Sequence, residues 1–174
     1  MNDTDLLNDF LKAKEAFGTK CSKYLGSLCV ELVRKALAEE GIEVSRRDCF
    51  IRGIPVEIDL LIPRQGAVAQ HGILYEAKDV LIVLEIKAHG AYGKEAVSSI
   101  RKNFIAIQEK HKSIQCFYVT LMERKGYKWS ITEERLGLPA YTLFFYTGNQ
   151  EDCKSTGDWQ RILSEINTRM KDVG

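Results

Sequence analysis

Apolar residues recur with the period of an amphipathic helix at the N-terminal end of the sequence. Over residues 20–40 they return every three or four positions, and Gly41 follows them as a helix stop. The apolar positions are Leu25, Leu28, Cys29, Leu32, Val33, Ala36 and Leu37. A shorter amphipathic stretch covers residues 5–17. The pattern therefore predicts two successive helices, of which the second is the longer.

The hydrophobic period then shortens to that of β-strands. Residues 49–52 predict a short strand, and a glycine and a proline after them indicate a turn. Residues 56–62 predict a second strand, which a polar loop over residues 65–72 follows. Residues 80–87 are an almost unbroken apolar run, which is typical of a strand buried on both faces of a sheet.

A helix and further strands complete the pattern. Gly90 and Gly93 precede a predicted helix over residues 94–110. Residues 114–121 and 141–146 predict two more strands, and residues 158–170 a final helix. The core order α-β-β-β-α-β predicts an α/β domain with a mixed sheet of four to five strands, flanked by helices.

Nothing in the sequence marks a domain boundary. There is no repeat, no low-complexity tract and no linker rich in proline or serine. A chain of 174 residues is long enough for one domain with its own core. We therefore expect one domain over residues 1–174, with a core of about 20–121 and a C-terminal extension over 122–174 that adds a strand and a helix.

Composition and charge exclude several classes of protein. The formal charge of +1 does not suit a histone-like binder, so any contact with nucleic acid must use locally gathered positive charge. The five cysteines form no CxxC pair, which argues against a zinc finger or a thioredoxin-like site. The sequence shows neither a secretion signal nor an apolar run of the roughly 18 residues that span a membrane. We expect a cytoplasmic protein.

Three charged residues interrupt the predicted strands. Asp59 lies inside the apolar segment VEIDLLI, although strand interiors disfavour Asp. Glu85 and Lys87 end the most apolar strand, and alternation puts both on one face. If the two strands pair, Asp59 lies beside Glu85. Two such carboxylates repel unless a proton or cation separates them, and Mg²⁺ is a natural partner for carboxylate oxygens.

Asp59 followed by Glu85-x-Lys87, 26 residues later and on adjacent strands after a helix, resembles the PD-(D/E)XK nuclease superfamily. These proteins share the restriction-endonuclease-like fold. The resemblance covers about residues 20–121, and EIDLLI…VLEIK is particularly similar to the branch that contains archaeal Holliday-junction resolvases. The motif proline of the family is not adjacent to Asp59, the nearest being Pro55.

The resemblance implies a role for each residue. Asp59 and Glu85 would ligate Mg²⁺, or Mn²⁺ in its place, with the main-chain oxygen of Ile86 as a further ligand. Lys87 would orient or deprotonate the attacking water and stabilise charge on the phosphate. Members of the family often carry an acidic residue on a helix as well, for which Glu31 is the candidate.

Other interpretations of these residues stay open. The three strand residues would also suit a structural carboxylate–lysine network or a solvated strand end. Glu31 would also suit an exposed helix position paired with Lys35. Glu57 shares a strand face with Asp59, but a structural or surface role is favoured for it. For His89 we favour a plain loop position.

One helix face would suit contact with phosphates. Lys94, Ser98 and Lys102 recur every four residues in the helix after the third strand, and a solvated polar face is the alternative. Trp129 and Trp159 would suit stacking on bases, although a core position is more usual for tryptophan.

Taken together, the sequence predicts a metal-dependent nuclease that hydrolyses phosphodiester bonds, with DNA as the expected substrate and endonucleolytic cutting. The alternatives are a non-catalytic nucleic-acid- or protein-binding module that keeps the fold, and an RNA-directed nuclease. A homodimer is also an open expectation, because a single site cuts one strand of a duplex at a time.

Overall fold

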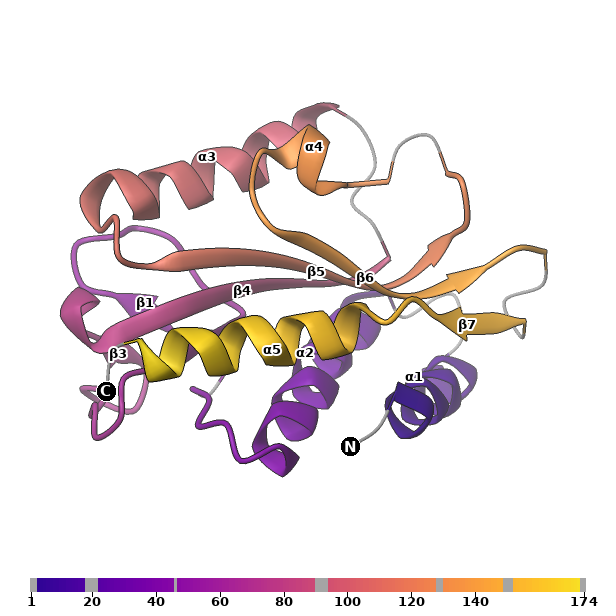
Figure 1. Cartoon of the computed structure of the whole chain (residues 1–174), viewed down its shortest axis with the longest axis horizontal. Coiled ribbons are helices and arrows are strands. Elements are labelled where there is room, and N and C mark those ends of the chain that lie inside the picture. The colour runs from indigo at the N-terminus through magenta and orange to yellow at the C-terminus, as the bar shows by residue number, and fades with distance from the viewer. Residues whose placement is uncertain are drawn as a thin grey trace.

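A mixed β-sheet with helices on both faces forms the body of the protein (Figure 1). The computed structural model describes residues 3–17, 22–45, 47–89, 94–127, 130–148 and 152–172. Helices α1, α2 and α5 cover one face of the sheet, and α3 and α4 cover the other (Figure 1). The helices are α1 (Asp3–Phe17), α2 (Ser22–Glu39), α3 (Lys94–Lys110), α4 (Glu133–Leu136) and α5 (Asp158–Lys171).

The central sheet has five strands in the order β2-β4-β5-β6-β7. Its strands are β2 (Leu60–Pro63), β4 (Val80–His89), β5 (Gln115–Arg124), β6 (Ala140–Tyr146) and β7 (Cys153–Ser155). Strands β4, β5 and β6 are parallel, and the two edge strands β2 and β7 run antiparallel to their neighbours. Helix α3 is the crossover that joins the parallel strands β4 and β5.

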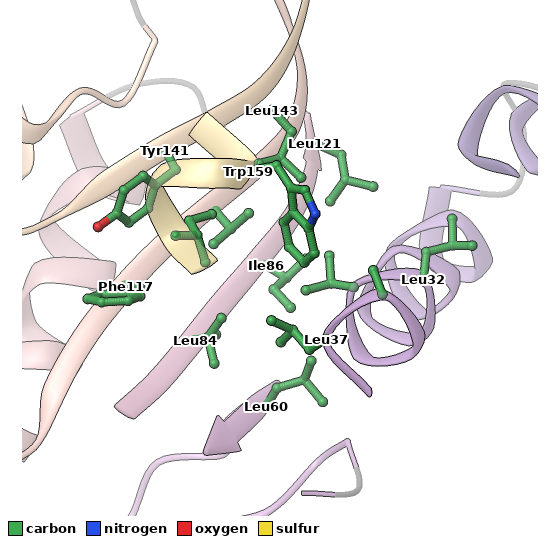
Figure 2. Packing of buried hydrophobic residues seen from close by; sticks show 14 of the residues in the cluster. Leu32, Leu37, Leu60, Leu84, Ile86, Phe117, Leu121, Tyr141, Leu143 and Trp159 are labelled. Carbon is green, nitrogen blue, oxygen red and sulfur yellow. The ribbon is translucent and has the colours of Figure 1, made fainter. Parts of the chain in front are cut away.

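Alternate residues of the central strands enter two separate cores. Leu84 and Ile86 of β4 pack with Leu60 of β2, Leu37 of α2 and Trp159 of α5 (Figure 2). The intervening apolar residues face α3 and α4 instead. The strand is apolar along its length because each face is covered by helices.

The main elements lie where the sequence predicted them. The α/β fold class with a five-stranded mixed sheet is confirmed. The predicted helix over residues 20–40 is α2, and the helix predicted over 94–110 has those bounds as α3. The apolar run at 80–87 is β4, which extends two residues further to His89.

The first predicted strand does not join the central sheet. Residues 50–51 form β1 (Phe50–Ile51), which pairs in parallel with β3 (Leu74–Tyr75) in a separate two-stranded sheet. A 3₁₀ turn, η1 (Ala77–Asp79), then leads into β4. No hydrophobic period in the sequence indicates β3, η1, α4 or β7, because elements of two to four residues are too short to show one.

The second predicted strand is shorter than expected. It was predicted to begin at residue 56, but β2 begins only at Leu60 and Asp59 lies in a bend just before it. Ile58 instead forms an isolated antiparallel bridge with Cys49. Within the described residues, no helix is both long enough and apolar enough to span a membrane.

Candidate active site

The predicted carboxylates meet where β2 begins and β4 approaches its end. Leu60 pairs with Leu84 in the antiparallel ladder, so Asp59, the residue just before β2, comes opposite Glu85. The Asp59 carboxylate accepts a hydrogen bond from the backbone amide of Ile86 at 2.7 Å. This bond holds Asp59 against the β4 backbone, between Glu85 and Lys87.

The ammonium of Lys87 bridges the two carboxylates. Its Nζ lies 2.6 Å from Oε1 of Glu85 and 3.7 Å from Oδ2 of Asp59. The side chains are only partly exposed, at 38% for Lys87 and 23% for each acid. Two acidic side chains therefore converge on the Lys87 ammonium, and their role as metal ligands stays a prediction.

Burial and neighbouring charges shift the pKa values of Glu85 and Lys87. Burial raises the pKa of Glu85, and the negative charge of Asp59 raises it further against the opposing effect of Lys87. Burial alone would lower the pKa of Lys87, but Glu85 and Asp59 outweigh it and raise that pKa above 10.5. The site therefore places the positive charge of Lys87 between two acidic side chains.

The donors in this site suit Mg²⁺. Two carboxylates and nearby backbone carbonyls are oxygen ligands, and Mg²⁺ is commonly held by one or two carboxylates while it keeps several waters. In the described part of the chain, no group of three or more His, Cys, Asp or Glu residues is placed to hold a metal. Asp59 and Glu85 would therefore be the only acidic ligands among these residues, with Ile86 as the predicted carbonyl ligand.

A cavity of about 170 Å³ opens beside Asp59 and Lys87, on the side of α2. Its lining comes from α2, from the segment before β1 and from the end of β4: Gly26, Ser27, Val30, Arg47, Asp48, Asp59, Ile86, Lys87 and Ala88. Sequence reasoning missed Ser27, Arg47 and Asp48. No local signal identifies them, because each reaches the cavity through the tertiary fold.

The structure does not bring Glu31 into the cavity lining. Its carboxylate pairs with Arg34 at 2.5 Å, and both side chains are partly exposed. Helix α2 presents Ser27 and Val30 to the cavity instead. The alternative pairing with Lys35 is also wrong, because the described partners of Lys35 are Asp9 and Glu39.

The predicted phosphate-binding face is described only in part. Ser98 and Lys102 line a shallow groove on α3 together with Glu95 and Ser99. The side chain of Lys94 lies outside the described residues. A role for these positions in nucleic-acid binding stays a prediction.

Three further residues from the sequence analysis are placed by the structure. Glu57 is exposed, and its charge contributes to the raised pKa of Glu85. His89 is not in a loop, because it ends β4 and its ring lies edge-on to Phe10 of α1, with the centroids 6.4 Å apart. Trp159 is buried in the core, which excludes it as a stacking platform, whereas Trp129 lies outside the described residues.

Comparisons with known proteins identify relatives in structure but not in sequence. No protein-family model matches the chain, and no curated protein matches it in sequence. The structure of NucC from P. aeruginosa ATCC27853 in its cAAA-bound form aligns over 96% of this chain and 88% of that one, with a TM-score of 0.64 and 10% identity.

NucC from E. coli MS115-1 gives the same result. Its cAAA-bound form aligns over 96% of this chain and 87% of that one, with a TM-score of 0.64 and 12% identity. Its apo form aligns over 95% and 89%, with a TM-score of 0.56 and 13% identity. NucC is a PD-(D/E)XK-type nuclease. The chain thus has a restriction-endonuclease-like fold, which it shares with NucC.

Proposed function

We propose that this protein is a metal-dependent nuclease that hydrolyses phosphodiester bonds, with DNA as its substrate and endonucleolytic cutting. The observation that carries the proposal is the convergence of Asp59 and Glu85 on the Nζ of Lys87. The fold shared with NucC supports the nuclease class. Mg²⁺, or Mn²⁺ in its place, would be held by the two carboxylates and the carbonyl of Ile86.

The chain's own groups suggest how they would act on a phosphodiester. The metal would supply an activated water and neutralise charge on the phosphate. The raised pKa of Lys87 keeps its side chain protonated at neutral pH, so it donates hydrogen bonds more readily than it accepts a proton. We therefore assign Lys87 to orientation of the water and to stabilisation of the negative charge that develops on the phosphate. Glu85 and Asp59 hold that lysine in position.

The test is cleavage by the purified protein of plasmid, linear duplex and branched DNA, and of single-stranded RNA, each with Mg²⁺ or Mn²⁺. Because two of the NucC structures contain cAAA, each assay is run with and without cAAA. We expect nicking of DNA by the wild type and its loss in Asp59→Ala and Lys87→Ala, while the exposed-site control Lys125→Ala keeps it. The absence of cleavage under every condition, or equal cleavage by the Asp59 and Lys87 variants, would overturn the proposal.

One observation favours a second function, a non-catalytic module that binds nucleic acid or a partner protein. Glu31, the helical acid that the family resemblance implies, pairs with Arg34 and does not line the cavity. Nucleic-acid binding that survives chelation of metal, without turnover of any substrate, would support this function. Preferential cleavage of RNA would instead support the RNA-directed alternative. Light scattering of the purified protein tests the expected homodimer.

A further inference from the structure

A short segment runs antiparallel along the outer edge of β2, next to the site. We call it the edge arm, described at Ser45 and residues 47–49. At one end, Ser45 N donates to the carbonyl of Leu61, and the Ser45 hydroxyl accepts from Leu61 N, both at 2.9 Å. At the other end, Cys49 and Ile58 exchange backbone hydrogen bonds of 3.0 and 2.9 Å. Both ends of the edge arm are therefore fixed to the strand that leads from Asp59.

Between these fixed ends the edge arm bulges. Ser45 and Cys49 are separated by three chain positions, whereas their partners Ile58 and Leu61 are separated by two. The extra residue is accommodated where Asp48 adopts a left-handed conformation, with φ of 56°. Left-handed backbone is uncommon for residues other than glycine but is tolerated by Asp. Bulges of this kind redirect side chains beside active sites.

The bulge sets Arg47 into the wall of the cavity. Asp48 N donates to the carbonyl of Asp59 at 3.3 Å, which ties the bulge to the candidate metal ligand. Arg47 and Asp48 both line the cavity, as do Ser27 of α2 and Lys87 of β4. Arg47 therefore lines the same small cavity as Asp59 and Lys87.

The guanidinium of Arg47 is weakly engaged. Among the described residues its ion pair is with Asp48, at 3.5 Å between Nε and Oδ2, and the two side chains are 42% and 55% exposed. Exposed pairs of this kind contribute little energy, so most of the donors of Arg47 remain open to a ligand. Planar, bidentate recognition of phosphate oxygens is what a guanidinium does best.

The size of the cavity limits what it can hold. At about 170 Å³ it is smaller than the roughly 300–1,000 Å³ of typical small-molecule sites. It has room for about five water molecules at ~30 Å³ each. A phosphate group with part of its hydration fits this space.

We propose that Arg47, with Ser27 beside it, binds a backbone phosphate of the nucleic acid next to Asp59 and Lys87. Contact at this site is with the sugar-phosphate backbone, so recognition there is independent of sequence. This inference rests on the proposed function for the nature of the ligand. It adds a phosphate-binding residue to the three residues of the nuclease motif, Asp59, Glu85 and Lys87.

The test is the affinity of the full chain for a fluorescently labelled DNA duplex, measured by anisotropy in EDTA and in Ca²⁺ from about 50 to 200 mM NaCl. The variants are Arg47→Ala, Arg47→Lys and the control Arg52→Ala. Arg52 carries the same charge and is 50% exposed, but it is engaged by Glu76 and Gln70 on another part of the surface.

Arg47→Ala should weaken binding about ten-fold and reduce the slope of log affinity against log salt by about one, equally for all sequences. Arg47→Lys should keep the salt dependence of binding but lose part of the affinity, because lysine lacks the planar guanidinium that donates two parallel hydrogen bonds to a phosphate. Arg52→Ala should match the wild type. Unchanged binding by Arg47→Ala, an equal loss in Arg52→Ala, or no binding by the wild type overturns the inference.

Failure of this inference is distinguishable from failure of the proposed function. A wild type that binds through Arg47 but cleaves nothing refutes the nuclease and keeps the phosphate site. A wild type that cleaves while Arg47→Ala keeps its affinity and salt slope refutes the phosphate site alone. In addition, a duplex with a single abasic residue should bind as tightly as the intact duplex, and a marked loss would show that a base is inserted.

Discussion

At the scale of single residues, the site is a balance between two carboxylates and one ammonium. The sequence predicted this trio because alternation along β4 places Glu85 and Lys87 on one face, and the pairing of β2 with β4 then brings Asp59 beside them. Glu31, the helical acid that the family resemblance implied, lies outside the cavity lining, whereas Val30 lines it. Successive helical residues lie about 100° apart, so a phase error of one residue exchanges the two. Arg47 was not predictable, because its position depends on a bulge against a strand that comes later in the sequence.

Replacement of Glu85 by Gln should stabilise the metal-free protein at neutral pH. The pKa of Glu85 is raised above its usual 4.5 by burial and by Asp59, so the fold prefers the protonated form. Its contribution is complete below that usual pKa, and stability is lost as the pH rises through the raised value. In EDTA, the melting temperature of Glu85→Gln relative to wild type should therefore increase between about pH 4 and pH 8.

The control for this prediction is Glu109→Gln on the exposed face of α3, which should show no such trend. A Glu85→Gln variant whose melting temperature differs from wild type by the same amount at both pH values would mean that Glu85 carries no electrostatic strain.

Replacement of Lys87 by Met should have the opposite effect on stability. The variant leaves Asp59 and Glu85 facing each other without the ammonium that now contacts both. Because Lys87 is 38% exposed, solvent screening limits the loss to about 1 kcal/mol, or ~2–4 °C in melting temperature for a chain of this size. Mg²⁺ or Mn²⁺ should raise the melting temperature of Lys87→Met more than that of wild type, since the ion replaces the lost positive charge.

Differential scanning fluorimetry with a titration of each ion measures this effect, with Lys125→Met as the matched surface control. If neither ion raises the melting temperature of Lys87→Met, the carboxylate pair does not bind a divalent cation.

At the scale of elements, length decided what was predictable from the sequence. The long helices α2 and α3 and the strand β4 each contain enough residues for a period to appear. Strands β1 and β3 contain two residues each and owe their pairing to contacts far apart in the sequence. Strand β2 is shorter than predicted because the edge arm pairs with Ile58 and displaces the regular ladder before Leu60.

The prediction at the scale of elements concerns how the edge arm is attached to the strand beside it. Its hydroxyl at Ser45 is buried and accepts the hydrogen bond of Leu61 N. Ser45→Ala leaves that buried amide without this partner, which should reduce the free energy of unfolding by about 1–3 kcal/mol. It should also loosen the bulge and weaken the part of DNA binding that depends on Arg47.

Urea denaturation and anisotropy measure the two effects, and Ser164→Ala on the exposed surface of α5 serves as the control. A stable Ser45→Ala variant with normal DNA binding would show that the hydroxyl does not hold the edge arm in place.

At the scale of the whole molecule, the central sheet separates two hydrophobic cores. The C-terminal region contributes strands to that sheet and apolar side chains to one of the two cores. Strand β6 pairs with β5, and Trp159, Ile162 and Ile166 of α5 are buried in the core that also contains Ile86. The residues after position 121 therefore cover one face of the strand that carries Glu85 and Lys87. They are not an addition to a core that is complete without them.

This arrangement predicts that the chain unfolds as one cooperative unit. In a Trp129→Phe background, Trp159 is the remaining tryptophan, and its fluorescence reports the packing of α5 against the sheet. Far-ultraviolet circular dichroism reports all helices and strands together. Because α5 shares its core with α2 and β4, loss of either partner exposes the other, so the two signals should give the same urea midpoint. A fluorescence transition that clearly precedes the dichroism transition would mean that α5 detaches first and that the site-bearing strands fold without it.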